Sequence, residues 1–251
     1  MAEPLLALRD LSKRFGGLTV THALSLDLHA GEIHAVIGPN GAGKTTLINL
    51  ISGTLAPDAG HVRFAGTDVT RWSLQRRARA GLARSFQITS VLERFTAREN
   101  VALAVQARSG SSFRFLRPVA RETGLNAAAE AELAAVGLGD RAAIPAARLS
   151  HGEKRQLELA MVLATAPRLL VLDEPLAGAG PEETARLVAL LRGLRGRFGV
   201  LLVEHDMDAV FALADRISVL VDGRLVVTGD AATVRAHPEV RSAYLGDDAL
   251  A

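Results

Sequence analysis

The amino-acid sequence predicts an α/β protein. We expect a mostly parallel β-sheet with helices on both faces, an antiparallel β region near the N-terminus and an inserted helical subdomain. After residue 152, short apolar runs alternate with longer helical patterns, as in parallel strands joined by helices. Leu24, Leu26 and Leu28 alternate with polar residues, which indicates a strand with one buried face. Between residues 96 and 139 the chain is rich in alanine, which favours helices.

The N-terminal third contains the first elements of the core. The apolar run at residues 33–37 stops at Gly38 and predicts a short buried strand. A helix is expected over residues 44–52, where Gly53 follows it. Further strands are expected at residues 61–64 and near residues 82–86.

An inserted helical subdomain is expected at approximately residues 88–165, within one domain that spans residues 1–251. Thr96 and Glu99 have the spacing of a capping box, so they should open a helix. Residues 109–112, with the sequence Ser-Gly-Ser-Ser, interrupt the helical pattern and predict a loop between two helices.

The remainder of the chain alternates between helices and buried strands. We expect helices at residues 152–165, 182–195 and 206–213, and strands at residues 169–172 and 200–203. A hairpin should follow, with strands at residues 217–221 and 225–227 joined by an Asp222-Gly223 turn. This order of elements predicts the mostly parallel sheet.

Composition excludes several classes of protein. The net charge is only +2, and no basic run is interleaved with aromatic residues, so nucleic-acid binding is not indicated. The absence of cysteine excludes disulfides, thiol catalysis and cysteine metal sites. No apolar run approaches the ~20 residues of a membrane span, and the N-terminus lacks a secretory pattern, so a cytoplasmic chain is expected. Lysine occurs only as Lys13, Lys44 and Lys154, which suggests positions that arginine does not suit.

A phosphate-binding loop is the strongest motif. The pattern G-x-x-x-x-G-K-[ST] is matched by Gly38, Pro39, Asn40, Gly41, Ala42, Gly43, Lys44 and Thr45. The expected strand precedes it and the expected helix follows it, so backbone N–H groups and the helix N-terminus should bind phosphates. Lys44 should reach the β- and γ-phosphates, and Thr45 should hold Mg²⁺. Thr46, the next residue, is also expected to contact the nucleotide. The alternative is a glycine-rich turn that only joins strand to helix.

A second acidic motif follows a later strand. Asp173 and Glu174 end the apolar run at residues 169–172. In a parallel sheet, residues at the carboxyl end of a strand face the same crevice as the phosphate loop. Asp173 is therefore expected to support Mg²⁺, and Glu174 to polarise the attacking water. Alone, the pair could be an acidic turn. With the phosphate loop it predicts a nucleoside-triphosphatase of the P-loop class.

Together with the phosphate loop and the acidic pair, several further residues make the chain resemble the ABC ATPase family. That family's signature L-S-G-G-Q is similar to the run Leu149, Ser150, His151, Gly152 and Glu153. Gln87 resembles the glutamine that joins the core to the helical subdomain and helps to hold Mg²⁺. His205 resembles the switch histidine, and Phe15 occupies the place of the aromatic residue that stacks on adenine. The resemblance implies the ABC ATPase fold, with Glu174, His205 and Gln87 as catalytic residues and Ser150 to Glu153 contacting nucleotide.

The sequence also departs from that family. His151 replaces the first signature glycine, Glu153 replaces the glutamine, and Gly180 stands where an aspartate is common. Ser150 and Glu153 also form a capping box, so they could simply start a helix. A capped helix N-terminus is still a good anion site, so both roles are compatible.

Further segments resemble the branched-chain amino-acid uptake branch of the family. They are residues 14–18 (Arg-Phe-Gly-Gly-Leu), the long helical insertion, residues 238–240 and residues 243–246. The resemblance implies ATP and Mg²⁺ as cofactors and a second ATPase subunit, identical or paralogous, in a head-to-tail dimer. It also implies transmembrane permease subunits, an external periplasmic solute-binding protein, and a peripheral location on the cytoplasmic face of the bacterial inner membrane. No nucleic acid is expected as a partner.

Other functions remain open at this stage. Related ATPases serve export, such as lipopolysaccharide transport. A soluble non-transport P-loop ATPase, kinase or GTPase would explain Lys44 and Asp173 but not the signature run. An ABC protein that binds DNA or ribosomes usually has two cassettes or a long coiled coil, and a non-hydrolysing sensor would not need Glu174.

Overall fold

A computed structural model describes residues 3–84, 91–108 and 123–244. The chain forms two units: residues 1–84 with 168–251, and residues 85–167. Gln87, the loop at residues 109–112 and the end of the strand expected near residues 82–86 lie outside the described residues.

The first unit contains a six-stranded sheet with the order β10-β9-β3-β8-β7-β6. Neighbouring strands are parallel except for β10, which is antiparallel to β9. This sheet confirms the predicted mostly parallel core. Its strands are β3 (Ile33–Ile37), β6 (Leu82–Arg84), β7 (Leu169–Asp173), β8 (Gly199–Val203), β9 (Arg216–Val221) and β10 (Arg224–Gly229).

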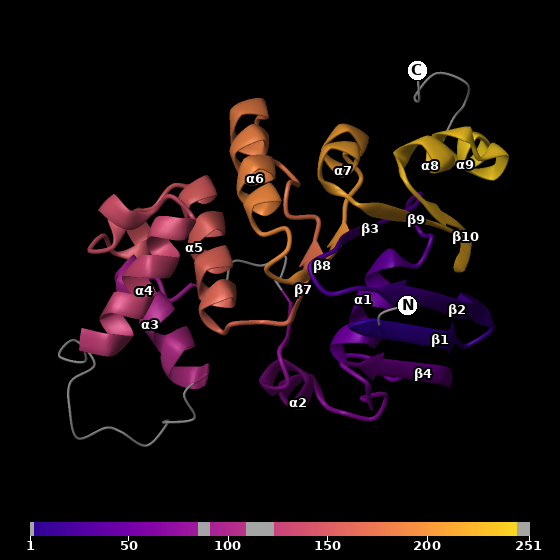
Figure 1. Cartoon of the computed structure of the whole chain (residues 1–251), viewed down its shortest axis with the longest axis horizontal. Helices are drawn as coiled ribbons and strands as arrows, with labels where there is room; N and C mark the ends of the chain where they lie inside the picture. Colours follow the sequence, from indigo (N-terminus) through magenta and orange to yellow (C-terminus); the bar gives the residue numbers. More distant parts are fainter. Residues whose placement is uncertain (1–2, 85–90, 109–122, 245–251) are drawn as a thin grey trace. The chain divides into compact units, whose positions relative to one another are not determined.

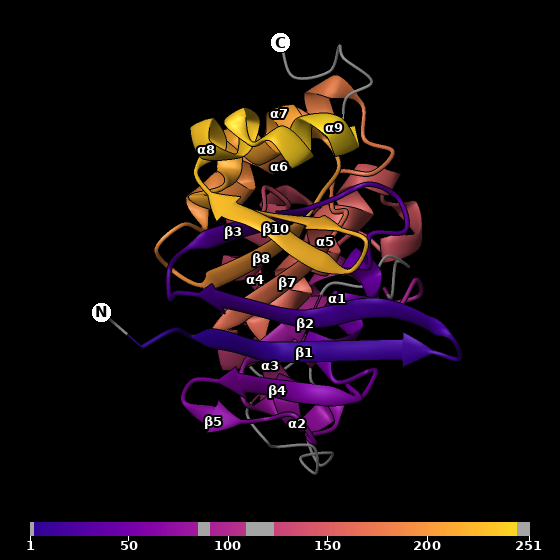
Figure 2. The same cartoon turned by 90° about the vertical axis from the view of Figure 1, so that its right-hand side faces the viewer.

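A second, four-stranded antiparallel sheet confirms the predicted N-terminal β region (Figure 2). Its strands are β2 (Leu18–Leu28), β1 (Leu6–Phe15), β4 (Ala59–Phe64) and β5 (Thr67–Asp68). The alternating leucines of β2 lie opposite β1, where Leu28 pairs with Leu6 and Leu26 with Leu8. These buried side chains join the core that also packs against the six-stranded sheet.

Helix α1 (Lys44–Ser52) contributes Leu47, Ile48, Leu50 and Ile51 to that core, and all four are buried. Other helices of this unit, labelled in Figure 1, contribute to two separate apolar clusters, one of which includes residues of β3 and β9. The remaining helices are α2 (Leu74–Arg79), α6 (Pro181–Gly193), α7 (Met207–Leu213), α8 (Ala231–Ala236) and α9 (Pro238–Tyr244).

The second unit is helical. It contains α3 (Ala97–Arg108), α4 (Thr123–Ala135), α5 (His151–Ala164) and two short 3₁₀ turns, Gly139–Arg141 and Ala146–Arg148. The Thr96–Glu99 capping box is confirmed, because the Thr96 N–H donates to Glu99 Oε2 at 2.7 Å and the Glu99 N–H donates to Thr96 Oγ1 at 3.2 Å. Among the described residues, no helix is long and apolar enough to cross a membrane.

Most predicted elements of the first unit, and α5, agree with the structure to within about two residues at each end, as expected for helix and strand boundaries. The strand predicted from Leu24, Leu26 and Leu28 is longer than expected, because β2 begins at Leu18, and the end of the strand expected near residues 82–86 lies outside the described residues. The main omission is β1. Its pairing with β2 contains register shifts between Leu8 and Leu11 and around Lys13, and Asp10 has φ +50°. These irregularities break the alternation of buried and exposed residues, which is the sequence signal for a strand.

Candidate functional site

The phosphate loop lies between β3 and α1, as predicted. Gly41 and Gly43 have φ of +84° and +100°, a region that favours glycine. A Cβ atom on Gly38 would lie 2.2 Å from the Leu220 carbonyl oxygen, and one on Gly43 would lie 2.6 Å from the Val20 carbonyl oxygen. Backbone packing therefore requires glycine at positions 38 and 43, while the positive φ values favour glycine at positions 41 and 43.

The N-terminus of α1 is suited to an anion. Within the described part of the chain, no side chain caps this helix and its first turn holds no acidic residue. Its free N–H groups and positive dipole end therefore remain available. Thr45 is exposed and Thr46 is half-buried in this first turn.

Lys44 is 8% exposed, and its Nζ donates to the carbonyl oxygens of Gly38 at 2.6 Å and Pro39 at 3.0 Å. The ammonium group therefore lies against the backbone of the phosphate loop. Burial lowers the pKa of Lys44, while the charges of Glu174 and Asp173 oppose this shift. The lysine of the loop and the two acidic residues after β7 are therefore close enough to interact electrostatically.

Asp173 is the last residue of β7 and is 4% exposed. Burial raises the pKa of its carboxyl group, and the nearby guanidinium of Arg84 opposes this shift. Glu174 follows with φ +48°, a conformation that is strained for a residue with a side chain, and its N–H donates to the Val203 carbonyl oxygen at 2.8 Å.

Sequence reasoning missed Arg84. Its Nη2 lies 3.1 Å from Asp173 Oδ2, and its Nη1 donates to Asn49 Oδ1 at 2.6 Å and to Ser52 Oγ at 3.3 Å. The side chain therefore ties the acidic end of β7 to the helix that follows the phosphate loop. No local pattern separates this arginine from the many others, so the sequence carries no signal for its role.

His205 follows β8, and its side chain is 62% exposed. The neighbouring Glu204 is fully buried and was also missed. Its carboxylate accepts hydrogen bonds from the N–H groups of Leu176 at 2.7 Å and His205 at 3.1 Å. Burial raises the pKa of Glu204, and these N–H donors oppose the shift. Glu204 thus connects the segment after β8 to the loop after β7.

The signature-like residues belong to the second unit, at the start of α5. Ser150 caps this helix and Glu153 completes the capping box, with Ser150 N donating to Glu153 Oε2 at 2.8 Å. Glu153 Oε1 also pairs with Arg141 Nε at 2.9 Å. Ser150 and His151 are exposed, and Gly152 is half-buried. The capping interpretation of this run is therefore confirmed, while its contact with nucleotide stays a prediction.

Phe15 ends β1 and is 50% exposed, with Lys13 Nζ 5.7 Å from the centroid of its ring. An exposed aromatic ring at a strand end is available to stack on a planar ligand. The stacking of Phe15 on adenine stays a prediction.

The residues present fit a Mg²⁺ site of the kind expected with a nucleotide. The described residues hold no cluster of three His, Cys, Asp or Glu side chains that would bind a metal alone. Mg²⁺ is commonly bound by one or two protein oxygens together with substrate phosphates. Buried Asp173 and the Thr45 hydroxyl in the first turn of α1 supply such oxygens, while Gln87, predicted with them, lies outside the described residues.

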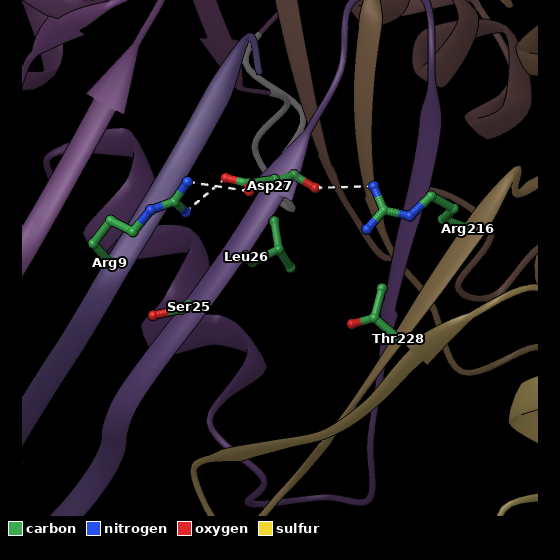
Figure 3. A pocket seen from close by; sticks show the side chains of 6 residues that line it. All are labelled: Arg9, Ser25, Leu26, Asp27, Arg216 and Thr228. Carbon is green, nitrogen blue, oxygen red and sulfur yellow. Dashed lines mark hydrogen bonds and ion pairs between the residues drawn. The ribbon is translucent and has the colours of Figure 1, made fainter. Parts of the chain in front are cut away.

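A separate cavity of about 230 Å³ contains none of the predicted site residues (Figure 3). Arg9 donates to the Asp27 carboxylate at 2.6 and 3.1 Å, and Arg216 Nη1 donates to the Asp27 carbonyl oxygen at 3.3 Å. Arg216 Nη1 also lies 3.2 Å from Glu32 Oε1, so both arginines that face this cavity already form ion pairs.

The chain is similar to known proteins over almost its whole length. Residues 21–177 match the family described as ABC transporter, and residues 224–249 match the family described as branched-chain amino acid ATP-binding cassette transporter. The chain is 36% identical to BraF of Pseudomonas aeruginosa and 37% identical to LivG of Escherichia coli K12, both named high-affinity branched-chain amino acid transport ATP-binding proteins. Each alignment covers 98% of this chain and 100% of the relative.

Solved structures agree in fold. An ATP-binding cassette of an ABC transporter in its ADP conformation matches with a TM-score of 0.85 and 26% identity, over 98% of this chain and 100% of that one. A nucleotide-free ATP-binding cassette matches over the same shares with a TM-score of 0.84. The predicted fold class is therefore confirmed.

Proposed function

Because this chain belongs to the ABC transporter family of ATP-binding proteins, we propose that it is the subunit that hydrolyses ATP to power uptake of branched-chain amino acids or a related small solute. The observation that carries this proposal is the phosphate loop, with its uncapped helix N-terminus and buried lysine, beside the acidic end of β7. The cargo assignment rests on the names of the relatives and on the match at residues 224–249.

In this proposal the loop N–H groups and Lys44 bind the ATP phosphates, and Phe15 stacks on the adenine. Thr45, Asp173 and Gln87 hold Mg²⁺, which when bound neutralises charge on the phosphate oxygens. Glu174 orients the water that attacks the γ-phosphorus, and His205 stabilises the developing charge. The strained φ of Glu174 supports its role, because such strain concentrates at functional sites.

Assembly follows from the same proposal. A second ATPase subunit, identical or paralogous, would dock head to tail, so that Ser150 and Gly152 of one subunit meet the ATP of the other. Ser150 and His151 are exposed at the N-terminus of α5, so they are accessible to a second subunit, which supports this arrangement. We infer that the helical unit, residues 85–167, is the inserted subdomain predicted at residues 88–165 and that it meets the permease.

The complete transporter would contain two permease subunits and an external periplasmic solute-binding protein. The ATPase chain would lie on the cytoplasmic face of the bacterial inner membrane. ATP would favour the closed dimer and ADP the open one, so the difference in affinity between the two states would drive the permease.

The Glu174→Gln variant tests the catalytic part of this proposal. ATP binding should change little, because the phosphates are held by the loop, while the ATPase rate should fall by about a hundredfold or more, because positioning and electrostatic terms dominate phosphoryl transfer. Phosphate release and equilibrium ATP binding are the measurements. An unchanged ATPase rate would contradict the role of Glu174.

The same variant reports on assembly. Its mass in solution should double with Mg-ATP in light scattering if Ser150 to Glu153 close on the nucleotide of a second copy. A monomer that still binds ATP would instead indicate a paralogous partner or closure that needs the permease. Lys44→Ala, which should not bind ATP, is the control that must remain monomeric.

A further inference from the structure

The turn between β9 and β10 contacts the phosphate loop. Gly223 in this turn donates its N–H to the Ala42 carbonyl oxygen at 3.1 Å, and its own carbonyl oxygen accepts from the His22 N–H at 2.8 Å. One residue therefore joins the loop to strand β2, although Gly223 lies far from both in the sequence.

Close backbone packing leaves no room for a side chain at Gly223 or at the loop glycines Gly38 and Gly43. A Cβ atom on Gly223 would lie 2.4 Å from the Val20 carbonyl oxygen, which is the same oxygen that approaches Gly43 of the loop. On the other side of the loop, the Leu220 carbonyl oxygen of β9 approaches Gly38. The loop, β2 and the hairpin thus pack backbone against backbone.

The hairpin alone does not explain this glycine. Asp222 and Gly223 have φ of +46° and +74°, as a two-residue hairpin turn requires. Asparagine or aspartate could also adopt that conformation. Only the close approach of Val20 excludes every side chain at position 223.

The hydrogen bond to Ala42 has a consequence inside the loop. In a trans peptide the carbonyl and the N–H point in opposite directions. Because the Ala42 carbonyl oxygen is held by Gly223, the Gly43 N–H of the same peptide is directed away from the hairpin. We propose that Gly223 is a positioning residue that fixes the Ala42–Gly43 peptide so that its N–H is aimed at a phosphate of the nucleotide. This inference rests on the proposed function of the loop.

Gly223→Ala tests the proposal, and Gly196→Ala is its matched control. Both glycines have left-handed φ, +74° and +80°, so both substitutions introduce the same type of backbone strain. A Cβ atom on Gly196 meets no atom within 4 Å, whereas one on Gly223 would lie 2.4 Å from the Val20 carbonyl oxygen of β2. The Gly223→Ala turn must therefore shift, and the hydrogen bond to Ala42 is expected to shift with it. Mg-ATP affinity is measured by calorimetry, and folding by circular dichroism and thermal unfolding.

We expect Gly223→Ala to weaken Mg-ATP binding by about tenfold or more relative to Gly196→Ala, because a hydrogen bond to a charged phosphate is misdirected. An affinity within about twofold of the control, a difference too small for a lost bond of this kind, would overturn the proposal. If wild type fails to bind Mg-ATP, or Lys44→Ala binds like wild type, the proposed function fails instead.

A second pair of variants covers the case in which Gly223→Ala does not fold. His22→Pro removes the N–H that holds the Gly223 carbonyl oxygen, while His22→Ala keeps it. Weaker Mg-ATP binding in His22→Pro than in His22→Ala is the expected result. Equal binding by two folded variants would contradict the proposal.

Discussion

At the scale of single residues, the side chain of Arg84 joins three elements. Its guanidinium contacts Asp173 at the end of β7 and both Asn49 and Ser52 of α1, and it is largely buried. A buried carboxylate whose charged partner is removed is left uncompensated in a medium of low dielectric constant. Arg84 is therefore expected to stabilise the acidic end of β7 next to the phosphate loop.

Arg84→Met should lower the free energy of unfolding by about 3 kcal/mol, because it removes the guanidinium that hydrogen-bonds to buried Asp173 and leaves only the weaker charge interaction with Lys44. Arg9→Met is the matched control, since Arg9 pairs with Asp27 at an exposed site and should cost less than about 1 kcal/mol. Urea unfolding without nucleotide gives both values. Equal stability of the two variants would contradict the role of Arg84.

At the scale of elements, α1 is held at both ends. Its N-terminus presents the phosphate loop, while Arg77 donates to the carbonyl oxygens of Leu50 at 2.7 Å and Ile51 at 2.6 Å at the C-terminus. Burial lowers the pKa of Arg77 to about 10, so it remains charged at neutral pH. A cation at the C-terminus of a helix interacts favourably with the helix dipole, so Arg77 stabilises α1.

Helix α5 offers a test that depends on pH. The Ser150 N–H lowers the pKa of Glu153 below its usual value of 4.5. A carboxyl group with a lowered pKa stabilises the fold above its unfolded pKa, and this contribution is lost as the pH falls through the folded pKa. Glu153→Ala should therefore cost about 1 kcal/mol at pH 7, the usual value of a helix cap, and less below pH 4.5.

Chemical unfolding of wild type and Glu153→Ala, at pH 7 and at a pH below 4.5, measures the difference in their free energies of unfolding. Because other carboxyl groups titrate in both proteins, only the difference between them is informative. A difference that did not change with pH would show that the Glu153 charge does not stabilise the cap.

At the scale of the whole molecule, the sheet order explains how distant segments meet. β3 lies between β8 and β9 in the six-stranded sheet, so the phosphate loop after β3 lies near the turns that follow both strands. The residues after β7 and β8 share this edge, because the strands are parallel. Carboxyl ends of parallel strands commonly form the ligand crevice of α/β proteins.

The proposed cargo is tested in cells, because the ATPase chain alone is not expected to contact the solute. Cells that lack this chain should lose uptake of labelled leucine and recover it with wild type. The Glu174→Gln variant should not restore uptake, since the permease would receive no energy from hydrolysis. Normal leucine uptake in the deletion strain would contradict the branched-chain assignment.

The sequence predicted most of the fold, because its signals were local. The phosphate loop, the acidic end of β7 and the capping boxes at Thr96 and Ser150 each involve residues within a few positions of one another. The short helices α2, α8 and α9 were not predicted, although α7, which is as short as α9, was predicted. Six or seven residues show only a small part of the helical period, so such helices give a weak sequence signal.

By itself, the sequence determined the family and predicted the phosphate-binding loop and the residues proposed for catalysis, since each belongs to a short recognisable pattern or is matched by the family resemblance. Only the tertiary structure decided which distant residues support them: Arg84 at Asp173, Glu204 at Leu176 and Gly223 at Ala42. The physical reason is that each support is a contact between segments far apart in the chain. Such a contact depends on the order of the strands and on backbone packing, and neither leaves a periodic or local mark in the sequence.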